Sequence, residues 1–373
     1  MFRNYRLRNF DFKLVIYVIA VTVIGIMAIG SAEESFQIKQ IRGAVVGVVG
    51  MVICILIDYH IIQKLYPLIY VVIIGLLSAV LFMGETSHNA QRWLKLGGVQ
   101  FQPSEFVKIL LILFYAAYIM KRKEEFNTFR VIAACVVLFA IPFFLVVKQP
   151  DLSTSIVLAA LFCVIMYAGK ISYKLIIAVL IIALPVAGIF IQKAMSKGSD
   201  FLEGYQMERL LGYFYPDEYP NISYQQKNSV TAIASGQLEG KGYKNNEITS
   251  VKNGKFLSEA ETDLIFAVVG EEFGFRGSAV VIILLFLIVL ECIDIGIRAP
   301  DICGSIIAAG VGGLIGFQTF INIGVATFLL PNTGLPLPFM SYGNSSLISL
   351  YAGIGFVLNV RLQMRRGSQN TVN

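Results

Sequence analysis

The chain has 373 residues, of which 56% are hydrophobic and only 14% are charged. Soluble proteins have about 25% charged residues, so this composition excludes a soluble enzyme and predicts an all-α polytopic membrane protein. The net charge of +6 would suggest nucleic acid as the partner of a soluble chain. Here we attribute it to basic residues on the cytoplasmic side of a membrane and expect no nucleic-acid partner.

Apolar runs of about 20 residues, the length that crosses a bilayer, recur from one end of the chain to the other. An even number of spans puts both termini on one side, and the clusters of Lys and Arg fall on that same side, which the positive-inside rule makes cytoplasmic. The sequence therefore predicts one membrane domain, residues 1–373, with one long extracellular loop at about 194–276. We predict about ten spans, at residues 14–32, 42–58, 65–83, 104–120, 131–147, 151–168, 172–193, 277–293, 302–328 and 340–360.

The outer loop after the third predicted span contains Trp93 between Arg92 and Lys95. One interpretation is an interfacial anchor, with the indole at the membrane surface and the two cations reaching toward water. The other is a phosphate site, because arginine and lysine bind phosphate oxygens through charge-assisted hydrogen bonds. His88 is expected to be a solvent-facing loop residue.

Two later spans begin with similar motifs, QPSE at 102–105 and KQPD at 148–151. Each places proline at a plausible first helical position and an acid in the first turn, and helix capping alone would explain both. Lys108 follows Glu105 by three residues, on the same helix face, and is essentially the only ionisable residue inside the predicted span cores. It is therefore a functional-site candidate, and its alternative is a structural ion pair with Glu105.

The long loop has tyrosines, glutamines, asparagines and glycines that suit binding to a hydroxyl-rich ligand, although an ordinary exposed loop has the same composition. Its end, residues 255–277, reads KFLSEAETDLIFAVVGEEFGFRG. Thr262 or Asp263 occupies the expected N-cap of a short interfacial helix at or above the membrane surface, where the helix dipole would keep a carboxylate ionised. The segment 274–277 predicts a break before the true span.

The last two predicted spans carry small and polar residues inside apolar sequence. Gly312 and Gly316 have the spacing of a close helix contact. Gln318 and Asn322, one turn apart, either bond neighbouring helices or line a cavity. The loop at 329–339 is rich in proline and is expected to be stiff.

Six motifs occur in order along the chain: AQRWLKLGG, QPSEFVK, KQPDLSTS, SGQLEGKGY, SEAETDLIFAVVGEEFGFRG and LPNTGLPLPFMSYGNSS. In this order across about ten spans, they make the chain resemble the SEDS family (shape, elongation, division and sporulation) of bacterial cell-wall glycosyltransferases. The resemblance covers nearly the whole chain. The short basic leader is more like that of the rod-shape members than that of the division members.

The resemblance implies an enzyme of the bacterial plasma membrane that polymerises lipid II, an undecaprenyl-pyrophosphate-linked disaccharide pentapeptide, at the outer face. It implies a class B penicillin-binding protein as the partner that crosslinks the product, together with membrane lipid. Asp263 stands at the position of the family's essential aspartate and is the predicted general base.

The departing pyrophosphate needs positive charge from basic side chains or from a divalent cation, Mg²⁺ or Mn²⁺, beyond which no cofactor is expected. The family match and the charge pattern together give the predicted substrate-binding residues, which are Arg92, Lys95, Glu105, Lys108, Lys148, Asp151, Arg209, Lys241, Glu259 and Ser341.

Two other functions stay open, a lipid II flippase and a non-catalytic scaffold of the wall-synthesis complex. The near absence of ionisable residues inside the spans argues against a transporter. The chain also departs from the usual family residues, and we expect the departures to affect loop geometry and partner preference more than reaction type. They are Ser153, Ser258, Glu261, Leu264, Phe328 and Asn344.

Overall fold

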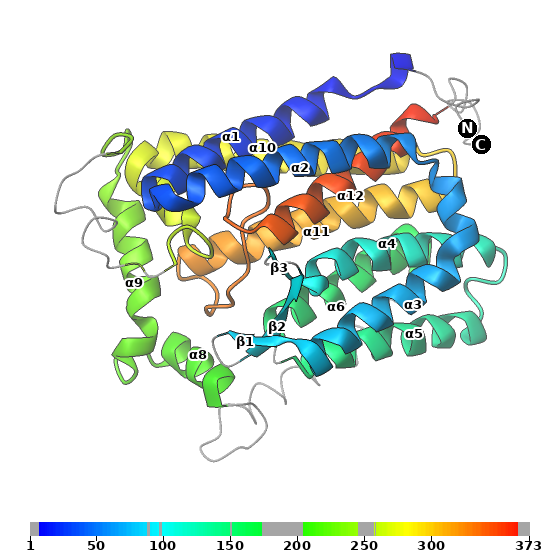
Figure 1. The fold of residues 1–373 in the computed structure, drawn as a ribbon, viewed down its shortest axis with the longest axis horizontal. Helices are drawn as coiled ribbons and strands as arrows, with labels where there is room; N and C mark the ends of the chain where they lie inside the picture. Colours follow the sequence, from blue (N-terminus) through cyan, green and yellow to red (C-terminus); the bar gives the residue numbers. More distant parts are fainter. Residues whose placement is uncertain are drawn as a thin grey trace.

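Long apolar helices lie side by side along the longest axis of the molecule (Figure 1). The computed structural model describes residues 7–87, 90–96, 99–149, 151–173, 204–244, 257 and 259–364. The long helices are α1 (Phe12–Ala32), α2 (Glu34–Leu56), α3 (Tyr59–Met83), α4 (Pro103–Lys121), α5 (Phe129–Val147), α6 (Leu152–Ala168), α10 (Ile265–Ile297), α11 (Ile302–Ala326) and α12 (Asn344–Leu362). Of these, 8 are long and apolar enough to cross a membrane, and α6 is a shorter apolar helix. The predicted all-α polytopic membrane fold is confirmed.

Most helix bounds lie within a few residues of the predicted spans, but α2 and α3 begin earlier. α2 starts at Glu34, directly after one extended residue, rather than near residue 42. Its first turns contain Lys39 and Arg42, which lower the hydropathy of the sequence without breaking the helix. The predicted span at 172–193 lies almost wholly outside the described residues.

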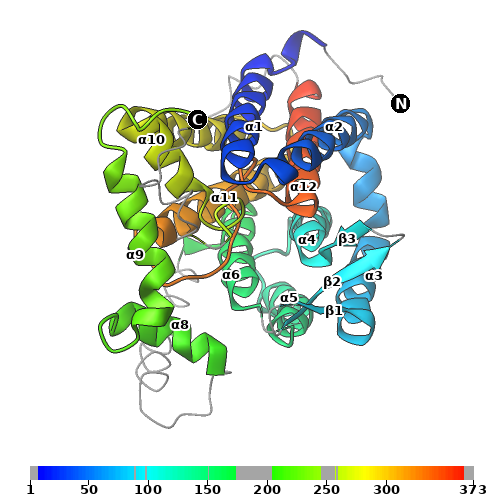
Figure 2. The ribbon, with the colours of Figure 1, turned by 60° about the vertical axis from the view of Figure 1, so that its left-hand side comes forward.

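The two ends of the bundle are built differently. At one end, the Asn9 side chain of the short helix η1 (Leu7–Asn9) donates a hydrogen bond of 2.8 Å to the Met364 carbonyl, just after α12. The opposite end, which we call the site end, carries the three strands and the two short helices (Figures 1 and 2). These are β1 (Glu85–Ser87), β2 (Ala90–Leu96), β3 (Val99–Phe101), α8 (Gly204–Phe214) and α9 (Pro220–Ser235).

The site end is more structured than predicted. The strands form an antiparallel sheet of order β1-β2-β3, in which Glu85 pairs with Trp93 and Leu94 with Phe101. The expected loop at 194–276 contains α8 and α9, neither of which was predicted, because their polar sequences give no membrane signal. Helical structure there depends on packing against the bundle.

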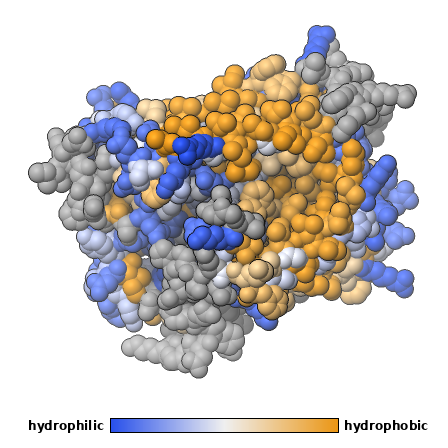
Figure 3. Space-filling model, viewed as in Figure 1, coloured by the Kyte–Doolittle hydropathy of each residue, from blue (hydrophilic) through white to orange (hydrophobic). Residues whose placement is uncertain are grey.

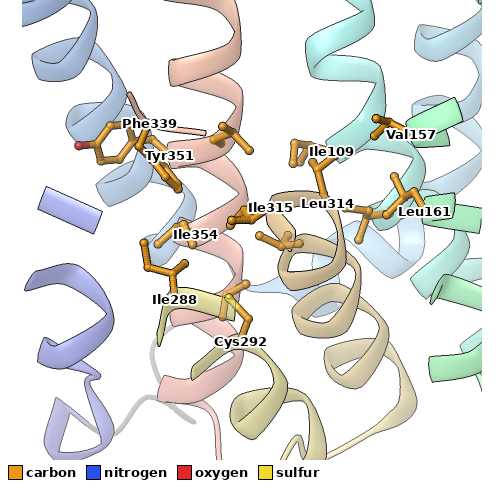
Figure 4. Close-up of a cluster of buried hydrophobic side chains, with 14 of the residues drawn as sticks. Ile109, Val157, Leu161, Ile288, Cys292, Leu314, Ile315, Phe339, Tyr351 and Ile354 are labelled. Carbon is orange, nitrogen blue, oxygen red and sulfur yellow. The ribbon is translucent and has the colours of Figure 1, made fainter. Parts of the chain in front are cut away.

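The core lies where α4, α10, α11 and α12 meet. Figure 4 shows Ile109 of α4, Cys292 of α10, Leu314 of α11 and Ile354 of α12 converging there, and all are buried. α4 and α12 are buried along most of their length, whereas α3 and α5 turn large apolar faces outward. On the face seen in Figure 3, hydrophobic side chains cover the side of the bundle and hydrophilic ones gather toward its ends. This distribution suits a bilayer around the bundle.

Glycines of α11 allow close helix approach, as predicted. A Cβ atom added to Gly312 would lie 2.8 Å from Cys292 Cβ of α10, so a side chain there would push the helices apart. At Gly316 the nearest atom would be 3.7 Å away, in Val289, which is an ordinary contact. The close-packing prediction is therefore confirmed at Gly312 and not at Gly316.

α10 changes direction at Gly274, whose backbone angles are φ 62° and ψ −160°. The predicted break at 274–277 is therefore present as a kink inside one long helix. The part before the kink, from Ile265 to Glu272, is buried inside the protein. The kink sets this first part of the helix apart from the longer part that follows.

Candidate active site

The turn that precedes α10 holds Asp263 in place. Glu259 opens the turn with φ 61°, and its carbonyl accepts hydrogen bonds from the Thr262 amide (3.2 Å) and hydroxyl (3.1 Å). Leu264, which is buried, is the N-cap position of α10, and no side chain caps the helix. The predicted N-cap role of Thr262 or Asp263 is therefore wrong, because the Thr262 hydroxyl bonds back into the turn.

The Asp263 carboxylate lies against the proline-rich loop instead. Gly334 in that loop has φ 73°, and a Cβ atom added to it would lie 3.1 Å from Asp263 Oδ2 and 3.6 Å from Arg209 Nη1. Arg209 belongs to α8, and its Nη1 donates a hydrogen bond of 3.4 Å to the Asn332 carbonyl. Three segments far apart in the sequence thus bring a carboxylate and a guanidinium together beside Gly334.

Asp263 has the electrostatic character of a base that titrates close to neutral pH. Its pKa is raised to about 6: burial is the largest cause, the negative charge of Glu259 adds to it, and Arg209 and Arg92 oppose the rise. The helix dipole was expected to favour the charged form, but desolvation raises the pKa above its usual value. A carboxyl group with this pKa is mostly ionised at pH 7 and still basic enough to accept a proton.

Arg92 of β2 is held toward the site by α6. Its Nη1 is 3.8 Å from Asp151 Oδ1, and the Asp151 carboxylate also accepts hydrogen bonds from the Thr154 amide (3.0 Å) and hydroxyl (2.8 Å). Asp151 is the N-cap of α6, so the capping interpretation of the KQPD motif is confirmed for the acid; Pro150 lies outside the described residues. Ser153 Oγ donates to the Thr333 carbonyl, which ties α6 to the loop of Gly334.

Glu105 and Lys108 form the predicted ion pair inside α4. Lys108 Nζ is 2.7 Å from Glu105 Oε1, and both side chains are buried. Pro103 is at the start of the helix, as predicted. Removing one partner of such a pair leaves a buried charge without compensation, which strongly destabilises the folded protein. The pairing is confirmed, and the substrate-binding role of the two residues stays a prediction.

The remaining predicted residues are spread over the site end. Lys241 Nζ is 2.8 Å from Glu271 Oε1, against the first part of α10. Lys95 and Lys148 are exposed, at β2 and at the end of α5. The Ser341 hydroxyl donates to the Thr262 carbonyl (2.5 Å) and accepts from the Leu337 amide (2.7 Å). It therefore connects the Asp263 turn to the loop that precedes α12. Their substrate-binding roles stay predictions, and His88 lies outside the described residues.

Two residues at the site were not predicted to act there, Gly334 and Asn322. The Asn322 side-chain nitrogen donates to the carbonyls of Asp263 (2.8 Å) and Leu335 (2.7 Å). The two amides were expected to bond neighbouring helices or to line a cavity; Asn322 bonds two loop carbonyls instead, and the buried amide of Gln318 has no hydrogen-bond partner in the described part of the chain. Gly334 carried one signal, its place between prolines in a loop where a left-handed residue is common.

A divalent cation finds no evident binding site in the described part of the chain. Within the ranges given above, no three His, Cys, Asp or Glu side chains are grouped so that they could hold a metal ion. Glu259, Glu261 and Asp263 share one turn without converging on one point. The predicted Mg²⁺ or Mn²⁺ stays a prediction, and we route no chemical step through it.

An apolar groove of about 590 Å³ runs along the bundle between α6, α10 and α11. Its walls include Val164 of α6, Val289 of α10, and Gly313, Gly316 and Phe320 of α11. The glycines open it by leaving the surface of α11 without side chains. Most of its lining, including Ile297 of α10 and Ser305 of α11, lies in the half of the bundle opposite the site end, and Phe320 is the lining residue of α11 that comes nearest to Asn322 in the sequence.

Comparison with known proteins places this arrangement in a family. Residues 6–366 match the family model of the FtsW, RodA and SpoVE cell cycle proteins. The chain belongs to this family. The predicted resemblance is therefore confirmed, over nearly the whole chain, for a multi-pass membrane protein of a bacterial family.

Similar members of the FtsW, RodA and SpoVE family have names and structures. The peptidoglycan glycosyltransferase MrdB of Escherichia coli (strain K12) is 32% identical over 369 residues, which cover 97% of this chain and 96% of MrdB. A solved structure of a peptidoglycan synthase complex that coordinates polymerization and crosslinking matches with a TM-score of 0.78 and 26% identity, over 94% of this chain and 97% of that one. The crystal structure of the rod shape determining protein RodA of Thermus thermophilus matches with a TM-score of 0.69 and 25% identity, over 94% and 96%.

Proposed function

We propose that the chain is a peptidoglycan glycosyltransferase that polymerises lipid II at the outer face of the plasma membrane. The observation that carries this proposal is the mostly buried Asp263 carboxyl, with a pKa of about 6, beside the Arg209 guanidinium and near Arg92. One base and two cations on three different segments suit a reaction that removes a proton and releases an anion. The name of the MrdB relative supports the substrate class.

In the proposed reaction, the C4 hydroxyl of one sugar attacks the anomeric carbon of the other. A C–O bond forms as the bond from the anomeric carbon to pyrophosphate breaks, with inversion at that carbon. Asp263 takes the hydroxyl proton, for which it must come within about 3 Å of the oxygen. Arg209 and Arg92 stabilise the negative charge that develops on the departing undecaprenyl pyrophosphate.

The polyprenyl chain of the substrate explains why such a site would be carried by membrane helices. We assign the polyprenyl tail to the apolar groove between α6, α10 and α11, whose lining is hydrocarbon and glycine apart from Tyr167 and Ser305. The tail already lies in hydrocarbon in the bilayer, so the groove would bind it by close packing and not by removing it from water. The groove would hold the far part of this long tail, in the half of the bundle opposite the site end, while the sugar head reaches Asp263.

The orientation follows from charge. The end of the bundle opposite the site carries Lys121 at the end of α4, Arg298 at the end of α10 and Arg361 in the last turn of α12. Basic residues at helix ends favour the cytoplasmic side, so the proposal places the site end outside the cell. A class B penicillin-binding protein is the proposed partner, supported by the similar complex that couples polymerization to crosslinking.

The decisive experiment compares wild type with Asp263→Asn, each purified with its penicillin-binding protein and supplied with labelled lipid II. We expect glycan strands from wild type and a loss of about 100-fold or more in the variant, the usual contribution of a general base. Glu261→Gln is the matched control, because it removes the same charge from the same turn and should keep most of the activity.

Other outcomes would favour other functions. Equal glycan from wild type and Asp263→Asn would remove Asp263 as the base. Movement of labelled lipid II across vesicle membranes without polymer would favour a flippase. A wild-type chain that binds the penicillin-binding protein, yet neither polymerises nor moves lipid II, would be a scaffold.

A further inference from the structure

Asn322 of α11 connects the two loops between which the site lies. Its side chain is 1% exposed, and its amide nitrogen donates one hydrogen bond to the Asp263 carbonyl (2.8 Å) and one to the Leu335 carbonyl (2.7 Å). Asp263 ends the turn before α10, and Leu335 follows Gly334 in the proline-rich loop. A side-chain amide has two N–H donors, so both are used on these carbonyls.

Further bonds join the same two segments. Ser341 Oγ donates to the Thr262 carbonyl (2.5 Å), and the Tyr342 amide donates to the Glu261 carbonyl (2.8 Å). The carbonyls of three successive residues, Glu261, Thr262 and Asp263, therefore each accept a hydrogen bond from outside the turn. Among these donors, Asn322 is the one that belongs to a long helix other than α10, so it connects the Asp263 turn directly to α11.

We infer that Asn322 is a positioning residue for the proposed glycosyl transfer: it fixes the backbone of Asp263 against the loop of Gly334, so that the carboxylate stays beside Arg209. This inference rests on the proposed function for its meaning, though the hydrogen bonds stand without it. Loss of the amide would leave two buried carbonyls without their donor. A displacement of about 1 Å in a reacting group lowers a rate by as much as about 100-fold.

Gln318 provides a matched control, one turn earlier on the same helix. It is 0% exposed, and neither of its amide atoms has a hydrogen-bond partner within the described part of the chain. Gln318→Leu and Asn322→Leu each replace a buried amide by an apolar side chain of similar size. Only Asn322→Leu removes bonds to the Asp263 turn, so a difference between the two reports those bonds.

The test measures glycan synthesis by both variants, in complex with the penicillin-binding protein, over a range of lipid II concentrations and pH. For Asn322→Leu we expect kcat to fall by about 10-fold to 100-fold with little change in KM. We also expect the acid side of its kcat/KM profile to move to lower pH, because a released carboxyl is less buried. Gln318→Leu should match wild type in both. A merely structural tie would lower thermal stability and leave the pH profile of the remaining activity in place.

A second readout does not depend on activity. Hydrogen exchange of the backbone amides just after Asp263 should be faster in Asn322→Leu than in wild type or Gln318→Leu. Should Asn322→Leu fail to fold, Ser341→Ala tests the same attachment through the Thr262 carbonyl, with the same direction of change.

The outcomes separate this inference from the proposed function. If wild type makes glycan, Asp263→Asn does not, and Asn322→Leu behaves like Gln318→Leu in kinetics and exchange, the positioning role is overturned and the proposed function stands. If wild type makes no glycan, the proposed function fails, while faster exchange in Asn322→Leu alone would still support the attachment of the turn.

Discussion

Several charged side chains act on the single carboxyl group of Asp263. Burial and the negative charge of Glu259 raise its pKa, whereas the positive charges of Arg209 and Arg92 lower it. The base in the proposed reaction must be ionised, so activity should fall as the pH drops through about 6. The balance of these charges can be changed one residue at a time.

We expect Glu259→Gln to move the acid limb of the kcat/KM profile to lower pH, and Arg209→Gln to move it to higher pH. Arg209→Gln should also lower the plateau, by about 10-fold or more, because the leaving pyrophosphate loses a cation. The measurement is the rate of glycan synthesis from about pH 5 to about pH 9, a range that includes the expected midpoint near 6. Glu218→Gln, an exposed acid between α8 and α9, is the control and should leave the midpoint unchanged. Shifts in the opposite directions would contradict this account of the site.

The same pKa predicts how stability depends on pH. The folded protein holds the Asp263 proton up to about pH 6, whereas an unfolded chain releases it near 3.8. Between these values the folded state binds more protons, so ionisation of Asp263 lowers stability as the pH rises through this window. Above pH 6, Asp263→Asn should therefore melt at a higher temperature than wild type, and below 3.8 the two should melt together.

The kink of α10 depends on contact between two stretches of backbone. A Cβ atom on Gly274 would lie 2.4 Å from the Gly240 amide nitrogen, and one on Gly236 would lie 1.9 Å from the Gly270 carbonyl oxygen. The Phe275 amide, displaced from the helix by the kink, donates instead to the Gln237 carbonyl (2.8 Å). The SGQLEGKGY motif thus supplies a hydrogen-bond acceptor for a backbone amide that the kink leaves without its helical partner.

At the scale of this element, we expect Gly274→Ala to lower stability by about 2 kcal/mol or more. Its backbone angles are essentially restricted to glycine, and the added carbon would meet backbone atoms that cannot turn aside. Thermal unfolding in detergent measures the effect. Gly50→Ala in α2 is the matched control, since a Cβ there meets nothing within 4 Å. An unchanged melting temperature for Gly274→Ala would mean that the kink is not needed.

At the scale of the molecule, the polar site end and the apolar groove lie on the same helix, α11. The groove lies along the apolar part of the bundle, and the Asp263 turn is attached to α11 by Asn322 near its end. A lipid-linked sugar needs both environments at once, because its tail is hydrocarbon and its head is charged and hydroxylated. The fold offers them as parts of one structure.

Filling the groove should therefore weaken substrate binding without touching Asp263. We expect Gly316→Leu to raise the KM for lipid II by about 10-fold, equivalent to about 1.4 kcal/mol of lost packing. The nearest atom to its Cβ would be 3.7 Å away, in Val289, so the first carbon of the new side chain fits without moving α10. Gly50→Leu, on the outer face of α2, adds the same side chain elsewhere. A KM that changes equally in both variants would argue that the tail lies outside the groove.

Sequence periodicity and charge predicted the helices well, and local motifs predicted contacts between near neighbours. The Glu105–Lys108 pair needs only the geometry of one helix, and so it was predictable from its spacing. The early start of α2 and the helices α8 and α9 were missed, because polar helices resemble loops in hydropathy. The N-cap prediction failed because the Thr262 hydroxyl bonds to Glu259 and the Asp263 carboxylate lies against the loop of Gly334, more than 70 residues away in the printed sequence.

By itself, the sequence determined that the chain is a helical membrane protein, where most of its spans lie, and that Asp263 is the acid to examine. Hydrocarbon burial and helix geometry act over a few turns and leave their pattern in the order of residues. The tertiary structure alone decided that Arg209, Gly334 and Asn322 surround that acid, and that its pKa rises. Desolvation and long-range hydrogen bonds depend on which distant segments meet, and no local pattern records that meeting.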